Sequence, residues 1–461
     1  MKFLLPTVQF NTDLLKKYDQ PLPRYTSYPP ATELRSDFSA VDYRQSIAAL
    51  NQRPSPLSLY VHIPFCQSAC YFCGCNVIVS NNKNIALSYL DYLIKEIQQA
   101  ATQIDSSKIV VQMHWGGGTP NYLTIEQIKL LWQTINQNFN LASDAEISIE
   151  INPRYVDQPY IQALREIGFN RISFGIQDFN PQVQAAVNRI QSEELLFNVM
   201  DWIRQARFDS VNVDLIYGLP YQTLDTFEET IQNTVDLHPD RIAIFNFAYV
   251  PWLKPVQKNI AEDTLPSPQE KLEILQMAIA DLTRNGYYYI GMDHFAKPDD
   301  ELSFAQRNGD LKRNFQGYTT QPEAELLGFG LSSISMLHDA YFQNHRRLQD
   351  YYKAVDQQQP PIEKGINLHR DDIIRREIIM QLMCHFSLSK ADVSAKYHLD
   401  FDTYFAPELA DLKALEADGL LNIFADDIDV TPTGRLLIRN IAAVFDSYLR
   451  DRIIANFSRA I

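Results

Sequence analysis

The chain has 461 residues, of which 46% are hydrophobic and 21% are charged, which is typical of a globular protein with two or three domains. Its formal net charge of −15 argues against nucleic acid as a partner. No apolar run approaches the ~20 residues that a membrane-spanning helix needs, and the apolar stretch at the start is too short for a signal peptide. We therefore expect a cytoplasmic protein without a membrane span.

The first 50 residues show no strong strand pattern. Their distinctive segment is Pro-Arg-Tyr-Thr-Ser-Tyr-Pro-Pro at residues 23–30, whose prolines favour an extended or turning path over a helix. A surface linker would explain this segment. However, Arg24 beside two tyrosines also suits a ring system that carries carboxylates.

From residue 54 the pattern alternates between strands and helices. Short runs rich in β-branched and aromatic residues predict six strands, at 58–63, 109–114, 146–151, 171–176, 210–217 and 241–248. Two helix starts carry capping-box spacing, at Thr124 with Gln127 and at Ser267 with Glu270. The alternation predicts an α/β fold with a parallel sheet and outer helices. Six units fit an open, partial (β/α)6 barrel, although a doubly wound sheet would give a similar pattern.

The first predicted strand leads into a cysteine-rich loop. Four of the five cysteines lie in residues 66–75, and the first three have the spacing C-x3-C-x2-C. Thiolates prefer zinc, copper(I) or iron–sulfur clusters, but a structural zinc site needs a second pair of ligands, and Cys384 stands alone. An odd cysteine count also disfavours disulfides. Three cysteines on one loop can hold three irons of a [4Fe–4S] cluster and leave the fourth open, so the spacing predicts a catalytic cluster.

Polar and glycine-rich segments follow the other predicted strands. The second strand ends in His-Trp-Gly-Gly-Gly-Thr-Pro at residues 114–120, whose glycines let the backbone approach a ligand closely. Glu150, Gln177 and Asp214 lie at the ends of the next three strands. Each alone reads as an ordinary strand-end group, but their recurrence favours a shared ligand. Arg189 is either a carboxylate clamp or a solvated charge at the start of a helix.

These motifs carry a family resemblance. The spacing C-x3-C-x2-C resembles the signature of radical S-adenosylmethionine (SAM) enzymes. The segments Tyr-Val-His-Ile-Pro-Phe-Cys at 60–66, Cys-Gly-Cys-Asn at 73–76 and residues 23–30 resemble those of the oxygen-independent coproporphyrinogen III oxidase family. The resemblance extends to Phe-Ser-Arg-Ala-Ile at 457–461. It implies a partial (β/α)6 TIM-like radical SAM barrel with an N-terminal arm and a mostly helical, winged-helix-like C-terminal domain.

The resemblance also implies site residues. Cys66, Cys70 and Cys73 would ligate a [4Fe–4S] cluster with an open iron. The contacts of the SAM bound at that iron would be Tyr60, Gly117, Glu150 and Ile334. A second SAM molecule would contact Phe72, Gly118, Thr119, Gln177, Arg189, Asp214 and Ala248. The residues expected in catalysis are Tyr60, His62 and Cys75; Cys75 could relay a proton, a hydrogen atom or an electron, or shape the loop.

We expect four segments along the chain. Residues 1–50 would form the arm that covers the active site, 51–296 the core barrel, 297–365 an extension over the SAM pocket, and 366–461 the helical domain. Winged-helix modules often bind DNA, but residues 371–461 contain 10 Lys+Arg and 15 Asp+Glu, so packing or substrate covering is expected. Cys384 lies in an apolar stretch and is expected to be a buried small hydrophobe.

The implied reaction is the oxidative decarboxylation of coproporphyrinogen III to protoporphyrinogen IX in haem synthesis. A 5′-deoxyadenosyl radical would remove a hydrogen atom from each of two propionates, which would lose CO2 and become vinyl groups. An anionic substrate on an acidic protein requires local cations, for which Arg24 and Arg313 are candidates. We expect a monomer and a low-potential electron donor of the flavodoxin or ferredoxin type.

Two alternatives remain. One is a haem-binding, chaperone-like relative of the same family, in which the Cys73–Cys75 element and the arm at residues 23–30 would be absent; both are present here. The other is a different radical SAM reaction on the same scaffold.

Overall fold

The computed structural model describes residues 8–449, which form two compact units. The larger unit contains residues 34–278 and 323–367, and the smaller unit contains the described parts of 1–33, 279–322 and 368–461. Each unit is assembled from stretches that lie apart in the sequence. The roles expected of segments 1–50, 51–296, 297–365 and 366–461 stay a prediction, and residues 457–461 lie outside the described part.

Six parallel strands form the centre of the larger unit, in the same order in space as in the chain. They are β1 (Leu57–Ile63), β4 (Ile109–Gly117), β5 (Asn140–Ile151), β6 (Arg171–Gln177), β7 (Ser210–Tyr217) and β8 (Arg241–Asn246). The predicted parallel α/β sheet is therefore confirmed. Five boundaries differ from the predicted ones. β1 begins at Leu57, β4 ends at Gly117, β5 begins at Asn140, β6 ends at Gln177, and β8 ends at Asn246, before Ala248.

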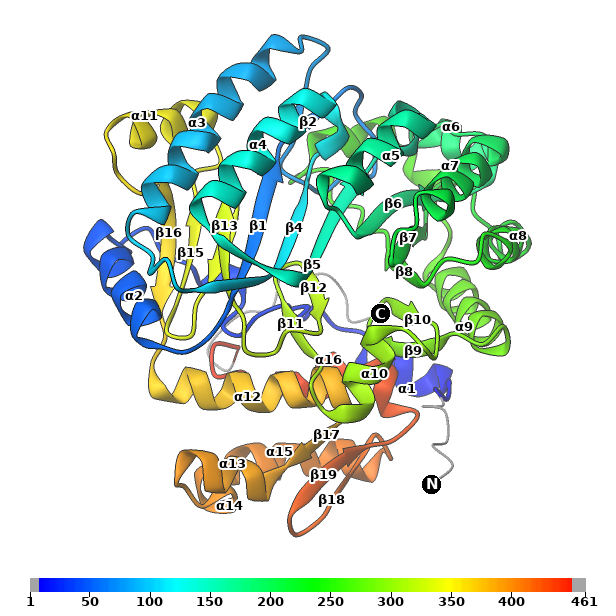
Figure 1. Ribbon diagram of the computed structural model, residues 1–461. Coiled ribbons are helices and arrows are strands. Elements are labelled where there is room, and N and C mark those ends of the chain that lie inside the picture. The colour runs from blue at the N-terminus through cyan, green and yellow to red at the C-terminus, as the bar shows by residue number, and fades with distance from the viewer. Residues whose placement is uncertain (1–7, 450–461) are drawn as a thin grey trace. The chain divides into compact units, whose positions relative to one another are not determined.

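Helices follow these strands and cover the sheet. They are α3 (Asn84–Ala101), α4 (Ile125–Asn138), α5 (Gln158–Ile167), α6 (Pro181–Ala186), α7 (Glu193–Gln205) and α8 (Leu224–Asp236). Figure 1 shows α3, α4 and α5 in a row in front of β1, β4 and β5. Both predicted capping boxes are present: Thr124 and Gln127 exchange bonds of 2.9 and 3.3 Å at the start of α4, and Ser267 and Glu270 exchange bonds of 2.7 and 3.3 Å at the start of α9 (Pro268–Arg284).

A second set of strands extends the sheet beyond β1. β13 (Glu325–Phe329) pairs with β1 in parallel, and β14 (Ile334–Met336), β15 (Ala340–Asn344) and β16 (Ile362–Asn367) follow in antiparallel order. Helices α2 (Ala40–Gln52) and α11 (Leu348–Asp356) complete this part of the larger unit. β1 is paired on both edges, and six of its seven residues are buried, which indicates that both faces of the strand are covered; only Tyr60 is partly exposed.

The smaller unit is mostly helical and contains short antiparallel strand pairs. Its N-terminal and middle elements are α1 (Thr12–Tyr18), β9 (Tyr288–Gly291), β10 (His294–Ala296), α10 (Glu301–Asn308), β11 (Lys312–Asn314) and β12 (Gly317–Thr319). Its C-terminal elements are α12 (Arg370–His385), β17 (Ser387–Ser389), α13 (Lys390–Tyr397), α14 (Phe401–Tyr404), α15 (Ala406–Ala417), β18 (Leu421–Ile423), β19 (Asp427–Val430) and α16 (Ile438–Ala443). Helices followed by the β18–β19 hairpin and a final helix match the expected winged-helix-like order. Cys384 is fully buried among apolar side chains, as predicted.

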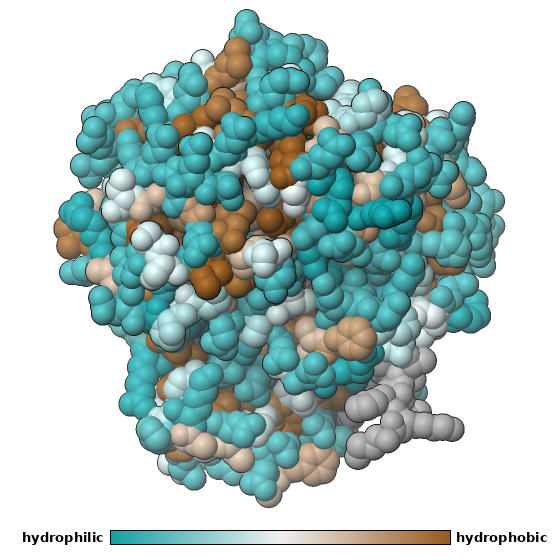
Figure 2. Space-filling model, in the orientation of Figure 1, coloured by the Kyte–Doolittle hydropathy of each residue, from teal (hydrophilic) through white to brown (hydrophobic). Residues whose placement is uncertain are grey.

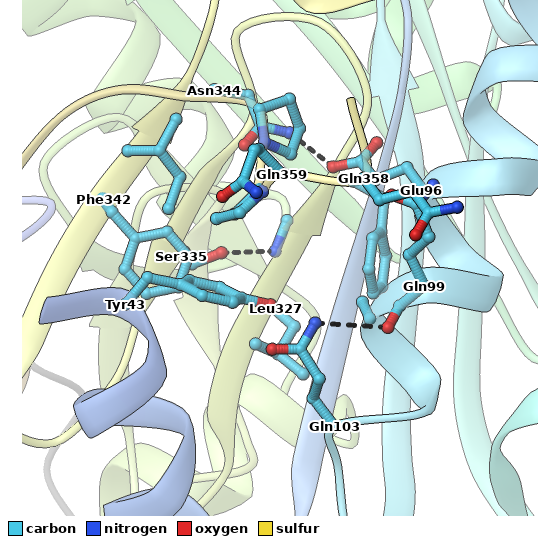
Figure 3. Close-up of a pocket in the computed structure, with 16 residues that line it drawn as sticks. Tyr43, Glu96, Gln99, Gln103, Leu327, Ser335, Phe342, Asn344, Gln358 and Gln359 are labelled. Carbon is cyan, nitrogen blue, oxygen red and sulfur yellow. Dashed lines mark hydrogen bonds between the residues drawn. The ribbon is translucent and has the colours of Figure 1, made fainter. Parts of the chain in front are cut away.

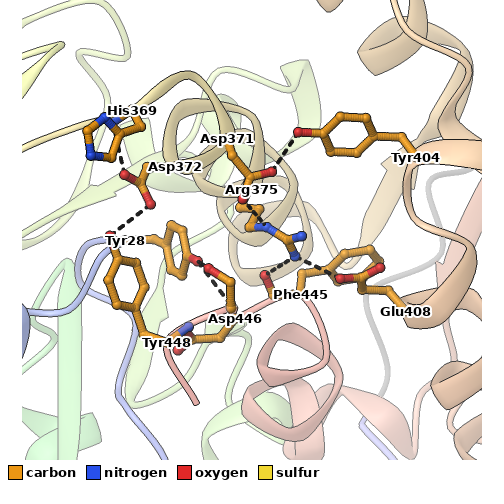
Figure 4. A network of polar contacts seen from close by, with 11 residues as sticks. Tyr28, His369, Asp371, Asp372, Arg375, Tyr404, Glu408, Phe445, Asp446 and Tyr448 are labelled. Atoms are coloured by element: carbon orange, nitrogen blue, oxygen red, sulfur yellow. Dashed lines mark hydrogen bonds and ion pairs between the residues drawn. The ribbon is translucent and has the colours of Figure 1, made fainter. Parts of the chain in front are cut away.

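The segment at residues 23–30 is held within the smaller unit by its tyrosines. Tyr25 and Tyr28 are buried; the Tyr25 hydroxyl donates to Asp446 at 2.9 Å, and that of Tyr28 lies 2.9 Å from Ser447 Oγ. Close by, Arg375 pairs with Asp371 at 2.7 Å and with Glu408 at 2.9 Å (Figure 4). The two tyrosines therefore anchor the segment, which explains them without a bound ring.

The surface of the visible face is mainly hydrophilic (Figure 2). Figure 2 shows hydrophilic side chains over most of one face, with smaller apolar patches between them. Within residues 8–449, no helix combines the length and the hydropathy that a membrane span requires.

Candidate active site

The parallel strands of the larger unit end around one cavity of about 380 Å³. Its walls come from the cysteine loop after β1, the turns after β4 and β5, strands β6 and β7, and the loop after β8. Carboxyl ends of parallel strands meet at one edge of a sheet, so distant residues converge there. The predicted site residues in this lining are Cys66, Cys70, Phe72, Cys73, Cys75, Gly117, Gly118, Thr119, Glu150, Gln177, Arg189 and Asp214.

The cysteine loop is closed at its base by two short parallel strands, β2 (Phe65–Cys66) and β3 (Ile78–Val79). Between them, all four thiols of the loop line the cavity, and none forms a disulfide. Cys66 Sγ lies 3.4 Å from Thr119 Oγ1, so the glycine-rich turn after β4 reaches the first cysteine. The fold thus brings the three cysteines of the motif to one wall.

Cationic side chains surround these thiols. Arg189 Nη1 lies 3.6 Å and Arg154 Nη2 lies 3.8 Å from Cys70 Sγ. The Cys75 thiol hydrogen-bonds to Cys73 and, with the charges of Lys254 and Arg189, lowers the pKa of Cys73 to about 6, whereas burial raises the pKa of Cys66 to about 11. Positive charge favours the thiolate form in which cysteine binds metals.

The glycine-rich turn fits against the end of β1 only because it lacks side chains. Gly117 has φ +111°, and a Cβ there would lie 2.5 Å from the His62 ring. A Cβ on Gly118 would lie 2.7 Å from the Pro64 carbonyl carbon, and the Gly118 N–H donates to Ile63 O at 2.8 Å. The turn therefore presents bare backbone to the cavity.

Tyr60 and His62, both on β1, are joined by a hydrogen bond. The Tyr60 hydroxyl lies 3.0 Å from His62 Nδ1, and His62 Nε2 lies 3.3 Å from Asn76 O. Burial lowers the pKa of His62 to about 4, so the ring is neutral near pH 7. A neutral ring that donates to Asn76 O from Nε2 must accept from Tyr60 at Nδ1. His62 thus braces the loop that contains Cys75.

Two carboxylates of the lining have opposite pKa shifts. Burial alone would raise the pKa of Glu150, but His114, whose Nε2 lies 3.1 Å away, lowers it below its usual value. Burial, followed by the charge of Glu150, raises the pKa of Asp214 to about 7, although Asn212 donates to it at 2.9 Å. The site thus offers one ionised and one readily protonated carboxyl group to a ligand that carries hydroxyl and amino groups.

Gln177 and Arg189 carry buried polar atoms without partners. Gln177 ends β6 at a register shift with φ +71°, a conformation that a glutamine rarely adopts. Its Oε1 and the Nε of Arg189 find no hydrogen-bond partner in the described part of the chain, although Arg189 Nη2 donates to Gly175 O at 2.8 Å. Buried polar atoms are nearly always satisfied, so these two fit a polar ligand in the cavity.

Of the residues predicted to act in catalysis or to contact the cluster or SAM, four lie outside the lining: Tyr60, His62, Ala248 and Ile334. Tyr60 and His62 act from β1, as described above. Ala248 is tied to the lining residue Phe72 through Gln257, whose Nε2 donates to Ala248 O at 3.1 Å and to Phe72 O at 3.3 Å. Ile334 begins β14.

The two candidate substrate residues belong to the smaller unit. Arg24 forms an ion pair with Asp293. Arg313 is buried on the ring of Tyr318, 4.4 Å from its centroid, and its Nε and Nη1 have no hydrogen-bond partner among residues 8–449.

Known proteins share these features along the whole chain. The family model described as "Radical SAM superfamily" matches residues 60–233, and that described as "HemN C-terminal domain" matches residues 368–437. The oxygen-independent coproporphyrinogen III oxidase of Synechocystis sp. is 61% identical over 466 residues, which is 100% of both chains. The Escherichia coli protein of the same name is 49% identical over 98% of this chain and 99% of its own. The chain belongs to the oxygen-independent coproporphyrinogen III oxidase family.

A solved structure agrees with this assignment. The coproporphyrinogen III oxidase (HemN) of Escherichia coli, described as a radical SAM enzyme, matches with a TM-score of 0.92 and 48% identity, over 96% of this chain and 100% of that chain. The predicted radical SAM fold is therefore confirmed. As a member of this family, the chain is a radical SAM oxidoreductase that uses a [4Fe–4S] cluster and SAM.

The residues of this chain fit a [4Fe–4S] cluster and SAM. Three free thiols on one wall, beside two guanidinium groups, provide the sulfur ligands that a cluster needs. SAM would find partners in the bare backbone of Gly117 and Gly118, in two carboxyl groups, and in the atoms of Gln177 and Arg189 that have no partner among residues 8–449.

Several contributors were missed from the sequence. Ser173 and Lys254 line the cavity, Arg154 contacts Cys70, and Gln257 joins Phe72 to Ala248. Only Ser173, which lies two residues before Gly175 on a predicted strand, had a signal in the alternation of the strand. The other three lie on irregular or 3-10 segments, where spacing carries no information.

Proposed function

We propose that this chain carries out the oxygen-independent oxidative decarboxylation of coproporphyrinogen III to protoporphyrinogen IX, converting two propionate side chains to vinyl groups with release of CO2. The observation that carries the proposal is the wall of Cys66, Cys70 and Cys73 at the carboxyl ends of the sheet. Relatives of that name, at 61% and 49% identity over essentially the whole chain, support the choice of substrate.

Within this proposal, Cys66, Cys70 and Cys73 are the ligands of the cluster. A cluster held by these three thiols would supply, when reduced, the electron for the cleavage of SAM, and SAM would supply the radical that removes a hydrogen atom from the propionate. Arg189 and Arg154 place positive charge next to Cys70, one of these proposed ligands.

We assign the first SAM to Tyr60, Gly117, Glu150 and Ile334, and a second SAM to Phe72, Gly118, Thr119, Gln177, Arg189, Asp214 and Ala248. The ionised Glu150 suits the amino group of SAM. Asp214, whose pKa burial raises to about 7, can share hydrogen bonds with ribose hydroxyls. The Nε of Arg189, which has no partner within the described residues, suits a carboxylate.

Cys75 is assigned to catalysis and not to the cluster. The Cys75 thiol forms a hydrogen bond with Cys73, and Lys254 Nζ donates to the backbone carbonyl of Cys75 at 3.4 Å. A fourth thiol in the lining that does not bind the cluster can relay a proton, a hydrogen atom or the electron that the substrate loses, or shape the loop. Tyr60 and His62 support it by bracing Asn76 next to it.

Arg24 and Arg313 are proposed to bind substrate carboxylates, and the unpaired Nε and Nη1 of Arg313 support this role. The proposal includes a low-potential donor of the flavodoxin or ferredoxin type, a monomeric enzyme and a place in the cytoplasm. The haem-binding alternative is disfavoured, because the Cys73–Cys75 element and residues 23–30 are both present.

The test is turnover after anaerobic reconstitution with iron and sulfide. Addition of SAM, a reductant and coproporphyrinogen III should yield CO2, 5′-deoxyadenosine and protoporphyrinogen IX. Binding of haem without any CO2 release would favour the chaperone-like relative instead.

A further inference from the structure

Helix α3 carries two buried polar side chains that the proposed chemistry does not use. Tyr89 and Glu96 lie seven residues apart, so two helical turns place them on the same side of α3. Tyr89 is fully buried and Glu96 is 5% exposed. Burial of a carboxylate is unfavourable unless hydrogen bonds or an opposite charge compensate for the lost hydration. The partners of Glu96 therefore indicate its role.

Glu96 accepts hydrogen bonds from three donors. Gly330 N–H donates to Oε2 at 2.8 Å, the Tyr351 hydroxyl donates to Oε2 at 2.5 Å, and Asn344 Nδ2 donates to Oε1 at 2.6 Å. Asn344 Nδ2 also donates to Gly330 O at 3.0 Å, so both backbone groups of Gly330 are held. Figure 3 shows Glu96 and Asn344 pointing toward each other.

Tyr89 ties the same turn to the catalytic strand. Its hydroxyl donates to His62 O at 2.7 Å, near the end of β1, and accepts from Leu331 N–H at 2.9 Å. The approach is close: Gly330 has φ +91°, and a Cβ there would lie 2.3 Å from Tyr89 Oη and 2.8 Å from His62 O. No residue other than glycine fits at this position.

The turn at residues 330–333 connects β13 to β14, and Ile334 is the first residue of β14. The cavity beside Glu96 measures about 40 Å³, which has room for a few water molecules but for no larger ligand. The hydrogen bonds of Glu96 and Tyr89 therefore hold the turn in place and do not form a ligand site.

We propose that Glu96 is a positioning residue, which fixes the 330–333 turn against the end of β1 and thereby sets the place of Ile334 beside SAM. This inference rests on the proposed role of Ile334. Its physical basis is that all three partners of Glu96 donate, so only a side chain with two acceptor oxygens satisfies them all.

The test compares three variants of the reconstituted full-length chain. Glu96→Leu removes both acceptors, and Glu96→Gln keeps one of them. Gln99→Leu is the matched control, because Gln99 lies on the same helix and beside the same cavity but bonds to Val355 O at 3.1 Å, away from the turn. The readouts are iron content, the dissociation constant for SAM by equilibrium dialysis, and amide hydrogen exchange of residues 328–335.

We expect Glu96→Leu to retain iron, to bind SAM about 10-fold more weakly and to exchange the Gly330 and Leu331 amides faster. Glu96→Gln should show a smaller change in both readouts, and Gln99→Leu should match the wild type. Unchanged exchange and affinity in Glu96→Leu, or equal losses in Gln99→Leu, would overturn the proposal.

Two further points keep the test decisive. If Glu96→Leu does not fold, Tyr351→Phe removes one donor to Glu96 and should weaken SAM binding in the same direction; no change would again refute the idea. Exchange of the turn can be measured without SAM. A wild type that binds no SAM would therefore count against the proposed function, while the exchange result would still judge Glu96.

Discussion

Arg189 is a buried cation that contacts both the cysteine loop and the end of β6. One of its nitrogens lies beside Cys70, another holds Gly175 O, and Nε has no partner in the described chain. From the sequence it was either a clamp or a solvated charge, and its 8% exposure excludes the solvated charge. Its burial depends on packing between β6 and the cysteine loop, which no local pattern reveals.

Arg189→Lys should keep the positive charge near Cys70 and lose the planar fork. We expect iron content to be retained and SAM to bind about 10-fold more weakly, which corresponds to ~1.4 kcal/mol. Arg284→Lys is the control, because Arg284 is 72% exposed. Equal effects of the two substitutions on SAM binding would contradict the role of Arg189.

The two kinds of cysteine in the loop make distinct predictions. Cys66→Ser should abolish cluster binding, whereas Cys75→Ser should keep the iron and lose turnover. Iron content per chain and CO2 release measure the two effects. A colourless, iron-free Cys75→Ser protein would mean that Cys75 is a ligand.

Asp178 predicts a pH dependence of stability. It is 1% exposed, and burial raises its pKa from 3.8 to about 6. Because the pKa of Asp178 is higher in the folded than in the unfolded chain, its contribution to the free energy of unfolding is fully present below pH 3.8 and is lost as pH rises through 6. The loss amounts to ~3 kcal/mol.

Asp178→Asn should remove this dependence. Urea unfolding of the metal-free chain between pH 4 and 7 should show a decline in the free energy of unfolding that is about 2 kcal/mol larger in the wild type than in Asp178→Asn. Parallel pH curves would show that the carboxyl group is not destabilised by burial.

At the scale of elements, the turn after β4 is the most constrained. Gly117→Ala would place a Cβ 2.5 Å from the His62 ring in a backbone conformation with φ +111°. Gly286→Ala provides the control, because Gly286 has φ +88° but no heavy atom within 4 Å of its Cβ position. Backbone strain should lower the stability of both variants by ~1–2 kcal/mol, while only Gly117→Ala should also weaken SAM binding, by at least ~10-fold. Equal SAM affinity in the two variants would refute a role for the close approach.

The elements that could be predicted are those with a local signal. All six parallel strands were predicted from short runs rich in β-branched and aromatic residues, and both capping boxes follow from residue type and spacing. The pairing of β13 with β1 could not be predicted, because it joins residues more than 260 positions apart. The same limit hid the Glu96 network, whose partners lie near residues 330 to 351.

At the scale of the whole molecule, the cysteine spacing, the glycine-rich turn and the strand-end carboxylates predicted one centre, and the structure brings them to one cavity. The contacts of Arg24 and Arg313 could not be predicted from the sequence. Their charge suggested substrate binding, but the ion pair of Arg24 with Asp293 and the packing of Arg313 on Tyr318 are visible only in the fold.

The most direct test of the central claim is a crystal structure of the anaerobically reconstituted chain with SAM. We predict density for a four-iron cube bound by the sulfur atoms of Cys66, Cys70 and Cys73, with SAM on the remaining iron. A fourth protein ligand on that iron, or a single tetrahedral zinc in place of the cube, would contradict the account.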